Sequence, residues 1–259
     1  INYGRNDIPS GSAKNNFLRL TKAANDRNSS EYFMYCDQDD IWHSNKIEVS
    51  LRRMKQLEDK YGVEVPLLVH TDLSVVDDTG NIVAESFLDY MKLPRKKDVR
   101  DVIIQNSVTG CTIMMNKALL KLVSKLEEDA PILMHDHAAA ILAAIYGRIS
   151  LVDEPTMDYR QHGDNQVGAS DANSLSYKLG RYKRGKESFR DDMNASYKQV
   201  EYIIDHFGIG DNIKPVVADM LREYSKLYTK NSKDKRKFFK KYKVYKNGQI
   251  RKIVQMMWS

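Results

Sequence analysis

Short apolar runs alternate with helical patterns over the first two thirds of the chain, and this alternation limits the possible folds more than any other feature. Apolar runs of strand type occupy residues 31–36, 67–70, 111–115 and 149–152, and helical spacing of apolar residues occupies 14–25, 45–61, 117–126 and 136–146. Strands separated by helices are typical of a sheet with helices packed on its faces. We therefore predict an α/β fold with a mixed, mostly parallel sheet flanked by helices.

Two further patterns define the organisation along the chain. The turn sequence at 77–81 separates two short apolar pairs, which predicts a β-hairpin over 75–83. Beyond Ser170 the strand patterns vanish, and helical patterns occupy 188–207 and 214–228. We therefore divide the chain into an α/β unit at 1–172 and a helical, basic C-terminal region at 173–259.

Positive charge is concentrated near the C-terminus. Residues 230–252 hold eleven Lys/Arg and one Asp, a net charge of +10, whereas the whole chain carries +6. The other residues of the chain therefore carry a net charge of −4. A nucleic-acid binder would be more uniformly basic, so we expect no nucleic-acid partner. We favour contact of 230–252 with an anionic membrane surface, with Phe238, Phe239 and Tyr242 entering the interface. Nucleic-acid binding and a solvated helix end are the alternatives.

The cysteine count and the hydropathy pattern indicate a cytoplasmic protein. The two cysteines, Cys36 and Cys111, each lie in an apolar run, which predicts two buried free thiols in a reducing compartment. No apolar run approaches the roughly 18–20 residues needed to span a bilayer, and the sequence does not open with a secretory signal.

The acidic cluster Asp37-Gln38-Asp39-Asp40 directly follows the first predicted strand. Ligands of open α/β sheets bind beyond the carboxyl ends of strands, and three neighbouring carboxylates repel one another unless a cation binds them. Mg²⁺ or Mn²⁺ suits such oxygen ligands and can bridge phosphate groups. A capping loop for the next helix is the alternative. A calcium loop of the EF-hand type is excluded, because Trp42 stands where that loop requires glycine.

Several segments together resemble the family 2 glycosyltransferases, in particular their bacterial rhamnosyltransferase-like branch. The most specific is Tyr35-Cys36-Asp37-Gln38-Asp39-Asp40-Ile41-Trp42 followed by Lys46. The others follow in the family's order, at 2–4, 12–17, 69–73, 106–111, 135–136, 153–155, 159–163 and 165. The resemblance covers about residues 1–170. It implies a nucleotide-sugar domain of the GT-A type, which is Rossmann-like, and transfer with inversion.

The resemblance also implies roles for individual residues on the donor side. Asp39 would hold the divalent cation, Mn²⁺ or Mg²⁺, against the donor diphosphate, and His162 would be a further metal or diphosphate ligand. The remaining donor-side candidates are Asp37, Asp40, Arg160 and Lys14. An ordinary loop position for His162, and a simple ion pair for Arg160, are the alternatives.

Asp136 matches the family's general base, which takes the proton of the acceptor hydroxyl. From the residues alone, an acidic side chain favoured by a helix N-terminus would be the simpler interpretation of Asp136. The acceptor-side candidates are Trp42, Gly110, Cys111 and His135, with packing slightly favoured for Trp42. His135 and His137 lie two residues apart on a predicted helix and so point to different faces; we expect His137 to be structural.

The family's opening strand–helix–strand unit, which binds the nucleobase, has no counterpart in this sequence. We expect the sequence to start within a longer protein; a truncated chain without activity is the alternative. The predicted function is transfer of a rhamnosyl or similar hexosyl group from a dTDP- or UDP-linked sugar to a glycan or lipid-linked acceptor, in polysaccharide synthesis at the inner face of the plasma membrane. The competing functions are a non-catalytic glycan- or membrane-binding relative and a two-metal nucleotidyltransferase.

Overall fold

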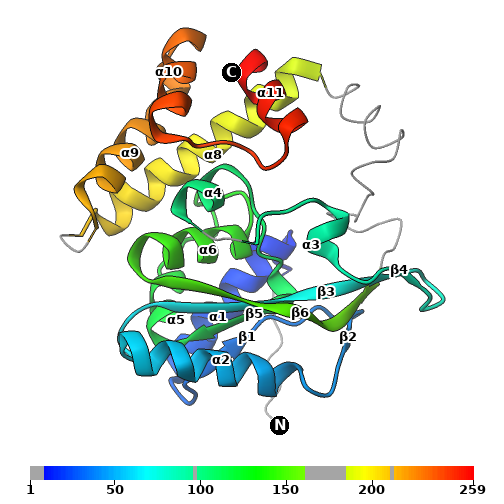
Figure 1. Cartoon of the computed structure of the whole chain (residues 1–259). Helices are drawn as coiled ribbons and strands as arrows, with labels where there is room; N and C mark the ends of the chain where they lie inside the picture. The colour runs from blue at the N-terminus through cyan, green and yellow to red at the C-terminus, as the bar shows by residue number, and fades with distance from the viewer. Residues whose placement is uncertain (1–8, 96–97, 161–184, 211–212) are drawn as a thin grey trace.

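A computed structural model of the chain describes residues 9–95, 98–160, 185–210 and 213–259. Within these ranges the centre of the molecule is a mixed sheet in the order β1-β5-β3-β6-β2, with β4 paired to β3 (Figure 1). The strands are β1 (Tyr32–Met34), β2 (Ile41–Trp42), β3 (Leu67–Val76), β4 (Ile82–Ala84), β5 (Ile113–Asn116) and β6 (Arg148–Arg160). The α/β class is confirmed, and so is the predicted hairpin, in which Val75 pairs with Ala84.

The direction of the strands differs from the prediction. In the described part of the chain, β3 and β6 run parallel, whereas β5 and β4 pair with β3 in the antiparallel sense, β1 with β5, and β2 with β6. The expectation of a mostly parallel sheet is therefore wrong, and the mixed sheet is not clearly Rossmann-like. Apolar runs predict where strands lie, but the connecting segments determine the direction of each strand. The hydropathy pattern does not predict the path of those segments.

Helices cover both faces of this sheet, as expected. One face packs against α2 (Lys46–Tyr61). Met54 and Leu57 of this helix form a hydrophobic cluster with alternate residues of the adjacent strands, whose side chains point to this face. The other face, to which the side chain of Leu68 points, packs against α1 (Ala13–Arg27), α5 (Lys117–Val123) and α6 (His135–Tyr146). Two shorter helices, α3 (Phe87–Tyr90) and α4 (Val99–Ile104), lie between β4 and β5 in the sequence.

The central parallel pair begins at a close backbone contact that requires glycine. A Cβ atom on Gly147 would lie 1.7 Å from the carbonyl oxygen of Pro66, and Arg148 N donates to that same oxygen at 2.9 Å. Close approach of this kind is available only to a residue without a side chain. Gly147 therefore both ends α6 and lets β6 start beside β3.

The described residues of the C-terminal region, 185–210 and 213–259, are mainly helical and pack above α4 and α6 (Figure 1). Its helices are α8 (Gly185–Phe207), α9 (Pro215–Ser225), α10 (Ser232–Tyr242) and α11 (Gln249–Trp258). Their buried side chains belong to the same hydrophobic cluster as those of α4, α5 and α6.

The predicted insertion of Phe238, Phe239 and Tyr242 into a membrane is contradicted, because all three rings are buried. They face inward from α10, where the ring of Phe238 lies 5.8 Å from that of Tyr224. The spacing i, i+1, i+4 places the three side chains on one face of the helix, and in this structure that face packs against the protein core.

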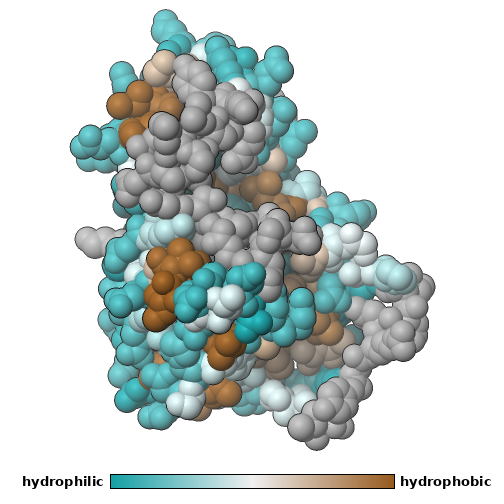
Figure 2. Space-filling model, turned by 90° about the vertical axis from the view of Figure 1, so that its right-hand side faces the viewer, coloured by the Kyte–Doolittle hydropathy of each residue, from teal (hydrophilic) through white to brown (hydrophobic). Residues whose placement is uncertain are grey.

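The surface carries hydrophobic side chains in several small patches on the face seen in Figure 2. Individually exposed apolar side chains include Ile82, Ile250 and Met257. Among the described helices, none combines the length and the hydropathy that crossing a bilayer requires.

Candidate active site

The acidic cluster lies in the loop after β1, where the chain leaves the edge of the sheet. Burial, with repulsion among the neighbouring aspartates, raises the pKa of Asp40 to about 6, and burial raises that of Asp37. The nearby Cys111 thiol and the backbone N–H of Arg160 partly offset this rise. The cluster is therefore an electrostatically unfavourable group that binding of a cation would stabilise.

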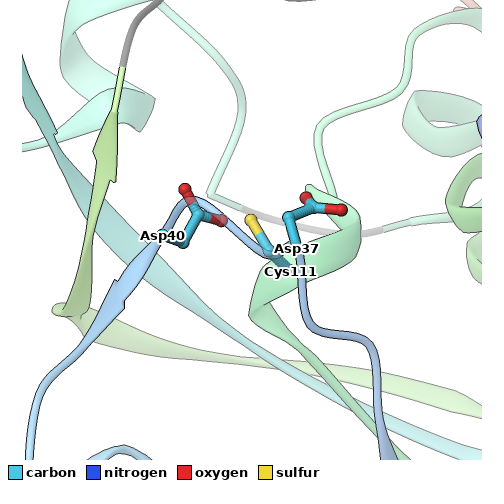
Figure 3. Close-up of side chains that lie close together, drawn as sticks. All are labelled: Asp37, Asp40 and Cys111. Atoms are coloured by element: carbon cyan, nitrogen blue, oxygen red, sulfur yellow. The ribbon is translucent and has the colours of Figure 1, made fainter. Parts of the chain in front are cut away.

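Three ligand atoms come together at this position. One carboxylate oxygen each of Asp37 and Asp40 and the sulfur of Cys111 all lie within 4.8 Å of one another. Figure 3 shows the sulfur between the two carboxylates. Burial raises the pKa of the Cys111 thiol well above its ordinary value, so the thiol stays protonated and the two carboxylates are the fitting ligands for a hard cation. Asp39 is not a member of this group in the structure, and His162 lies outside the described residues.

Gly110 and Cys111 connect the acidic loop to Asp136. They form a buried 3-10 turn, Gly110–Thr112, just before β5. The N–H of Gly110 donates to Oδ2 of Asp136 at 3.0 Å, while the thiol of Cys111 points to Asp37 and Asp40. Burial chiefly raises the pKa of Asp136, and repulsion from Asp37 adds to this rise, so the two acidic groups lie close enough to interact.

Asp136 is a buried carboxylate in the first turn of α6. Besides Gly110, it accepts hydrogen bonds from the N–H of His137 at 2.6 Å and from Nδ2 of Asn106 at 3.2 Å. These three donors favour the charged form, but burial outweighs them and raises the pKa of Asp136 to about 6. A fixed carboxylate with a pKa near neutrality has the properties of a general base.

A cavity of about 430 Å³ opens beside Asp136. Its walls come from both parts of the chain, and their lining includes Leu73, Asn106, Tyr159, Met193 and Lys246. Burial and the nearby charges of Asp37 and Asp40 raise the pKa of Tyr159, so this wall of the cavity lies close to the acidic loop. A volume of this size lies within the range of small-ligand sites, roughly 300–1,000 Å³.

The two histidines of α6 point to different faces, as predicted. His135 stacks on Phe17, with ring centroids 4.2 Å apart, and meets Tyr35 edge-on. Neither of its ring nitrogens has a hydrogen-bond partner among the residues that the structure describes. Burial lowers its pKa to about 4, so the imidazole is neutral.

The remaining predicted residues occupy varied positions around the site. Lys14, on α1, donates to the carbonyl oxygen of Ala130 at 3.3 Å, in the loop before α6. Trp42 packs half-buried against the cluster of Leu73, Val75, Cys111 and Met157. Arg160 ends β6, and its backbone N–H helps to lower the pKa of Asp40. Cys36 is exposed, so the prediction of two buried thiols holds only for Cys111.

Sequence reasoning missed two residues of the site. Asn106 was recognised as part of a motif, but its hydrogen bond to Asp136 spans thirty residues of sequence and leaves no local pattern. Lys46 is fully buried beneath the acidic loop, with Nζ 3.4 Å from Oγ1 of Thr156 and 5.0 Å from the centroid of Trp42. Burial lowers the pKa of Lys46, while attraction to Asp40 opposes this shift.

Comparison with known proteins gives one informative match. Over 188 residues the chain is 27% identical to the dTDP-rhamnosyl transferase RfbG of Shigella flexneri. The match covers 67% of this chain and 56% of the relative, so the chain spans little more than half of that protein's length. No model of a known protein family matches the chain. The match supports a relationship to glycosyltransferases.

Proposed function

We propose that the protein is an inverting glycosyltransferase that moves a rhamnosyl or similar hexosyl group from a nucleoside-diphosphate sugar to a glycan or lipid-linked acceptor. One observation carries the proposal: a buried carboxylate, Asp136, held by three N–H donors, faces a cavity next to the acidic loop. This arrangement supplies a base on one side of a reacting centre and a site for phosphate-bound cations on the other.

In the proposed reaction the acceptor hydroxyl enters from the cavity and attacks the anomeric carbon of the donor sugar. The new C–O bond forms as the bond between that carbon and the diphosphate oxygen breaks, and the electron pair leaves with the nucleoside diphosphate. The hydroxyl proton passes to Asp136. The N–H groups of Gly110 and His137 hold the carboxylate while its charge changes.

A divalent cation, Mn²⁺ or Mg²⁺, would neutralise the charge that develops on the leaving diphosphate. The Asp37 and Asp40 carboxylates fit such an ion, since their oxygens already lie together and repel each other. Asp39 and His162 stay proposed further ligands of the cation or the diphosphate. Arg160 and Lys14 stay proposed contacts of the diphosphate.

For the donor we propose a dTDP-linked sugar, because the match is to a dTDP-rhamnosyl transferase. UDP-linked sugars are the second choice. We also propose that the acceptor belongs to cell-surface polysaccharide synthesis, at the inner face of the plasma membrane.

Calorimetric titration with dTDP and UDP, with and without Mn²⁺, tests the donor site. We expect binding that requires Mn²⁺, favours dTDP, and is lost in Asp40→Asn and Asp39→Asn. The matched control is Asp59→Asn, which alters an exposed carboxylate on α2 and should bind like the wild type.

Transfer is then assayed with dTDP-rhamnose by release of dTDP in the presence of glycan acceptors. The proposal fails if a well-folded chain binds neither nucleotide under any metal condition. Nucleotide binding without transfer to any acceptor would instead favour a non-catalytic relative.

A further inference from the structure

Gln199 connects the C-terminal helices to the turn that carries Asp136. It lies on α8 and is fully buried. Its side-chain amide contacts one residue that precedes Asp136 in the sequence and one that follows it. Oε1 accepts a hydrogen bond from the N–H of Leu133 at 2.6 Å, and Nε2 lies 3.3 Å from Nδ1 of His137. The amide therefore joins the loop before α6 to the first turn of α6.

The N–H of Leu133 can only donate, and the direction of the hydrogen bond between Gln199 and His137 follows from the state of the His137 ring. Burial lowers the pKa of His137 to about 4, so the ring is neutral and carries one N–H. Nε2 lies 2.7 Å from the carbonyl oxygen of Val102, which can only accept, so the proton resides on Nε2. Nδ1 is then an acceptor and takes its hydrogen bond from the NH₂ group of Gln199. Both groups of the amide thus have complementary partners.

This network bears directly on the carboxylate. The backbone N–H of His137 donates to Oδ1 of Asp136 at 2.6 Å, so a shift of His137 would move the donor that orients the carboxylate. Val102, at the other end of the network, belongs to α4, which is two residues from Asn106, the third partner of Asp136. The same helix as Gln199 contributes Asp192, Met193 and Ser196 to the cavity wall.

We propose that Gln199 is a positioning residue of the transferase: by fixing Leu133 and His137 it sets the direction of the Asp136 carboxylate toward the cavity, and it makes α8 part of the catalytic unit. This inference rests on the proposed function. It assigns the C-terminal helical region a role in the chemistry as well as in packing.

The test compares Gln199→Met with Tyr224→Phe in the full chain. Methionine keeps the volume of glutamine but removes both hydrogen bonds. Tyr224→Phe removes another buried hydroxyl, which bonds to the carbonyl oxygen of Ile103 on α4 and to Oγ of Ser196 on α8, and does not touch the Asp136 turn. We expect kcat to fall roughly 10–100-fold in Gln199→Met, a range typical of a misplaced catalytic group. Donor affinity should change less than about twofold, and Tyr224→Phe should keep wild-type kcat.

Gln199→Glu provides a second variant, because its carboxylate can still accept from Leu133 but cannot donate to a neutral His137. We expect an intermediate loss of kcat. Equal kcat in Gln199→Met and Tyr224→Phe would overturn the proposal, and so would losses that follow melting temperature alone across the three variants.

A readout independent of turnover separates this inference from the proposed function. In protein labelled with ¹³C at the aspartate carboxyl carbons, the Asp136 signal is identified by its loss in Asp136→Asn. We expect that signal, and its titration, to shift in Gln199→Met and to stay in place in Tyr224→Phe. An unchanged signal in Gln199→Met overturns the positioning role even if the wild type transfers sugar. Absence of transfer by the wild type, with the signal shifted, rejects the proposed function alone.

Discussion

The backbone N–H of Gly110 lies 3.0 Å from Oδ2 of Asp136, and the next residue, Cys111, directs its thiol at Asp37 and Asp40. Two consecutive residues of one turn thus contact both acidic groups of the site. The turn precedes β5, which pairs with both β1 and β3, so the sheet fixes its position. The relative placement of base and acidic loop is therefore a property of the sheet.

Transfer should depend on pH through Asp136. Burial raises its pKa to about 6, and the base acts only when deprotonated. We expect kcat/KM for transfer to rise with pH up to about 6 and to level off above it, as measured from pH 5 to 8 at constant ionic strength. At saturating Mn²⁺, Asp136→Asn should lower transfer by about 10²–10⁴-fold and abolish the pH dependence. Wild-type activity that is flat across pH 6 would contradict the assignment of Asp136 as the base.

Gly110→Ala should damage catalysis more than folding. A Cβ at this position would lie 3.1 Å from Nε2 of His135, whose ring must move by a few tenths of an ångström, and 3.4 Å from Cβ of Asp136, in direct contact with the side chain whose position matters. We expect a loss in kcat of roughly tenfold or more, since small displacements of a catalytic group are costly. Gly210→Ala is the control, because its Cβ would meet nothing within 4 Å. Similar activity in the two variants would show that Asp136 tolerates the shift.

The sequence predicted six of the helices (α1, α2, α5, α6, α8 and α9) and the starts of β1, β3 and β6 well. It did not predict β2, the helices α3, α4, α10 and α11, or the extent of β3 and β6. The expected strand 149–152 continues to Arg160, although Asp153, Glu154 and Pro155 read as a turn. The continuation exists because β6 changes register against β3 after Thr71 and resumes pairing at Asp72. Register shifts of this kind depend on the partner strand, which a local pattern does not contain.

Buried polar residues account for a second group of differences between the predicted and the observed structure. Asp72 interrupts an apolar strand but is buried, and its carboxylate accepts hydrogen bonds from the N–H groups of Leu73 and Leu88 and from Oγ of Ser86. The partners from Ser86 and Leu88 lie fourteen and sixteen residues away. The acidic loop and Asp136 could be recognised by their motifs, whereas the hydrogen bonds of Asn106 and Gln199 are long-range contacts that no local pattern indicates.

Proton binding should compete with cation binding at Asp40. Burial and the neighbouring aspartates raise the pKa of Asp40 to about 6, so a metal must displace a proton below that pH. We expect the affinity for Mn²⁺ to rise from pH 5 to pH 7, with release of about one proton per ion at pH 5 and little at pH 7.5. Calorimetry in buffers of different ionisation enthalpy measures both quantities. Asp40→Asn should remove the proton release; release that persists in this variant would assign it to another group.

Two helix N-caps should differ in their contribution to stability. Asn116 caps α5 through a hydrogen bond from Leu119, accepts from Leu67, and donates to the carbonyl oxygens of Val63 and Val65. Asn231 caps α10 at an exposed position, accepting from Lys233 and Asp234.

Asn116→Ala leaves buried partners unsatisfied, so we expect it to lower the free energy of unfolding by about 3–4 kcal/mol, more than loss of a cap alone. Asn231→Ala should cost about 1 kcal/mol, because water can replace the lost cap. Urea unfolding of both variants measures the difference. Equal losses would mean that the four hydrogen bonds of Asn116, which tie the start of β3 to the end of β5, contribute no more to the sheet than one solvent-exposed cap.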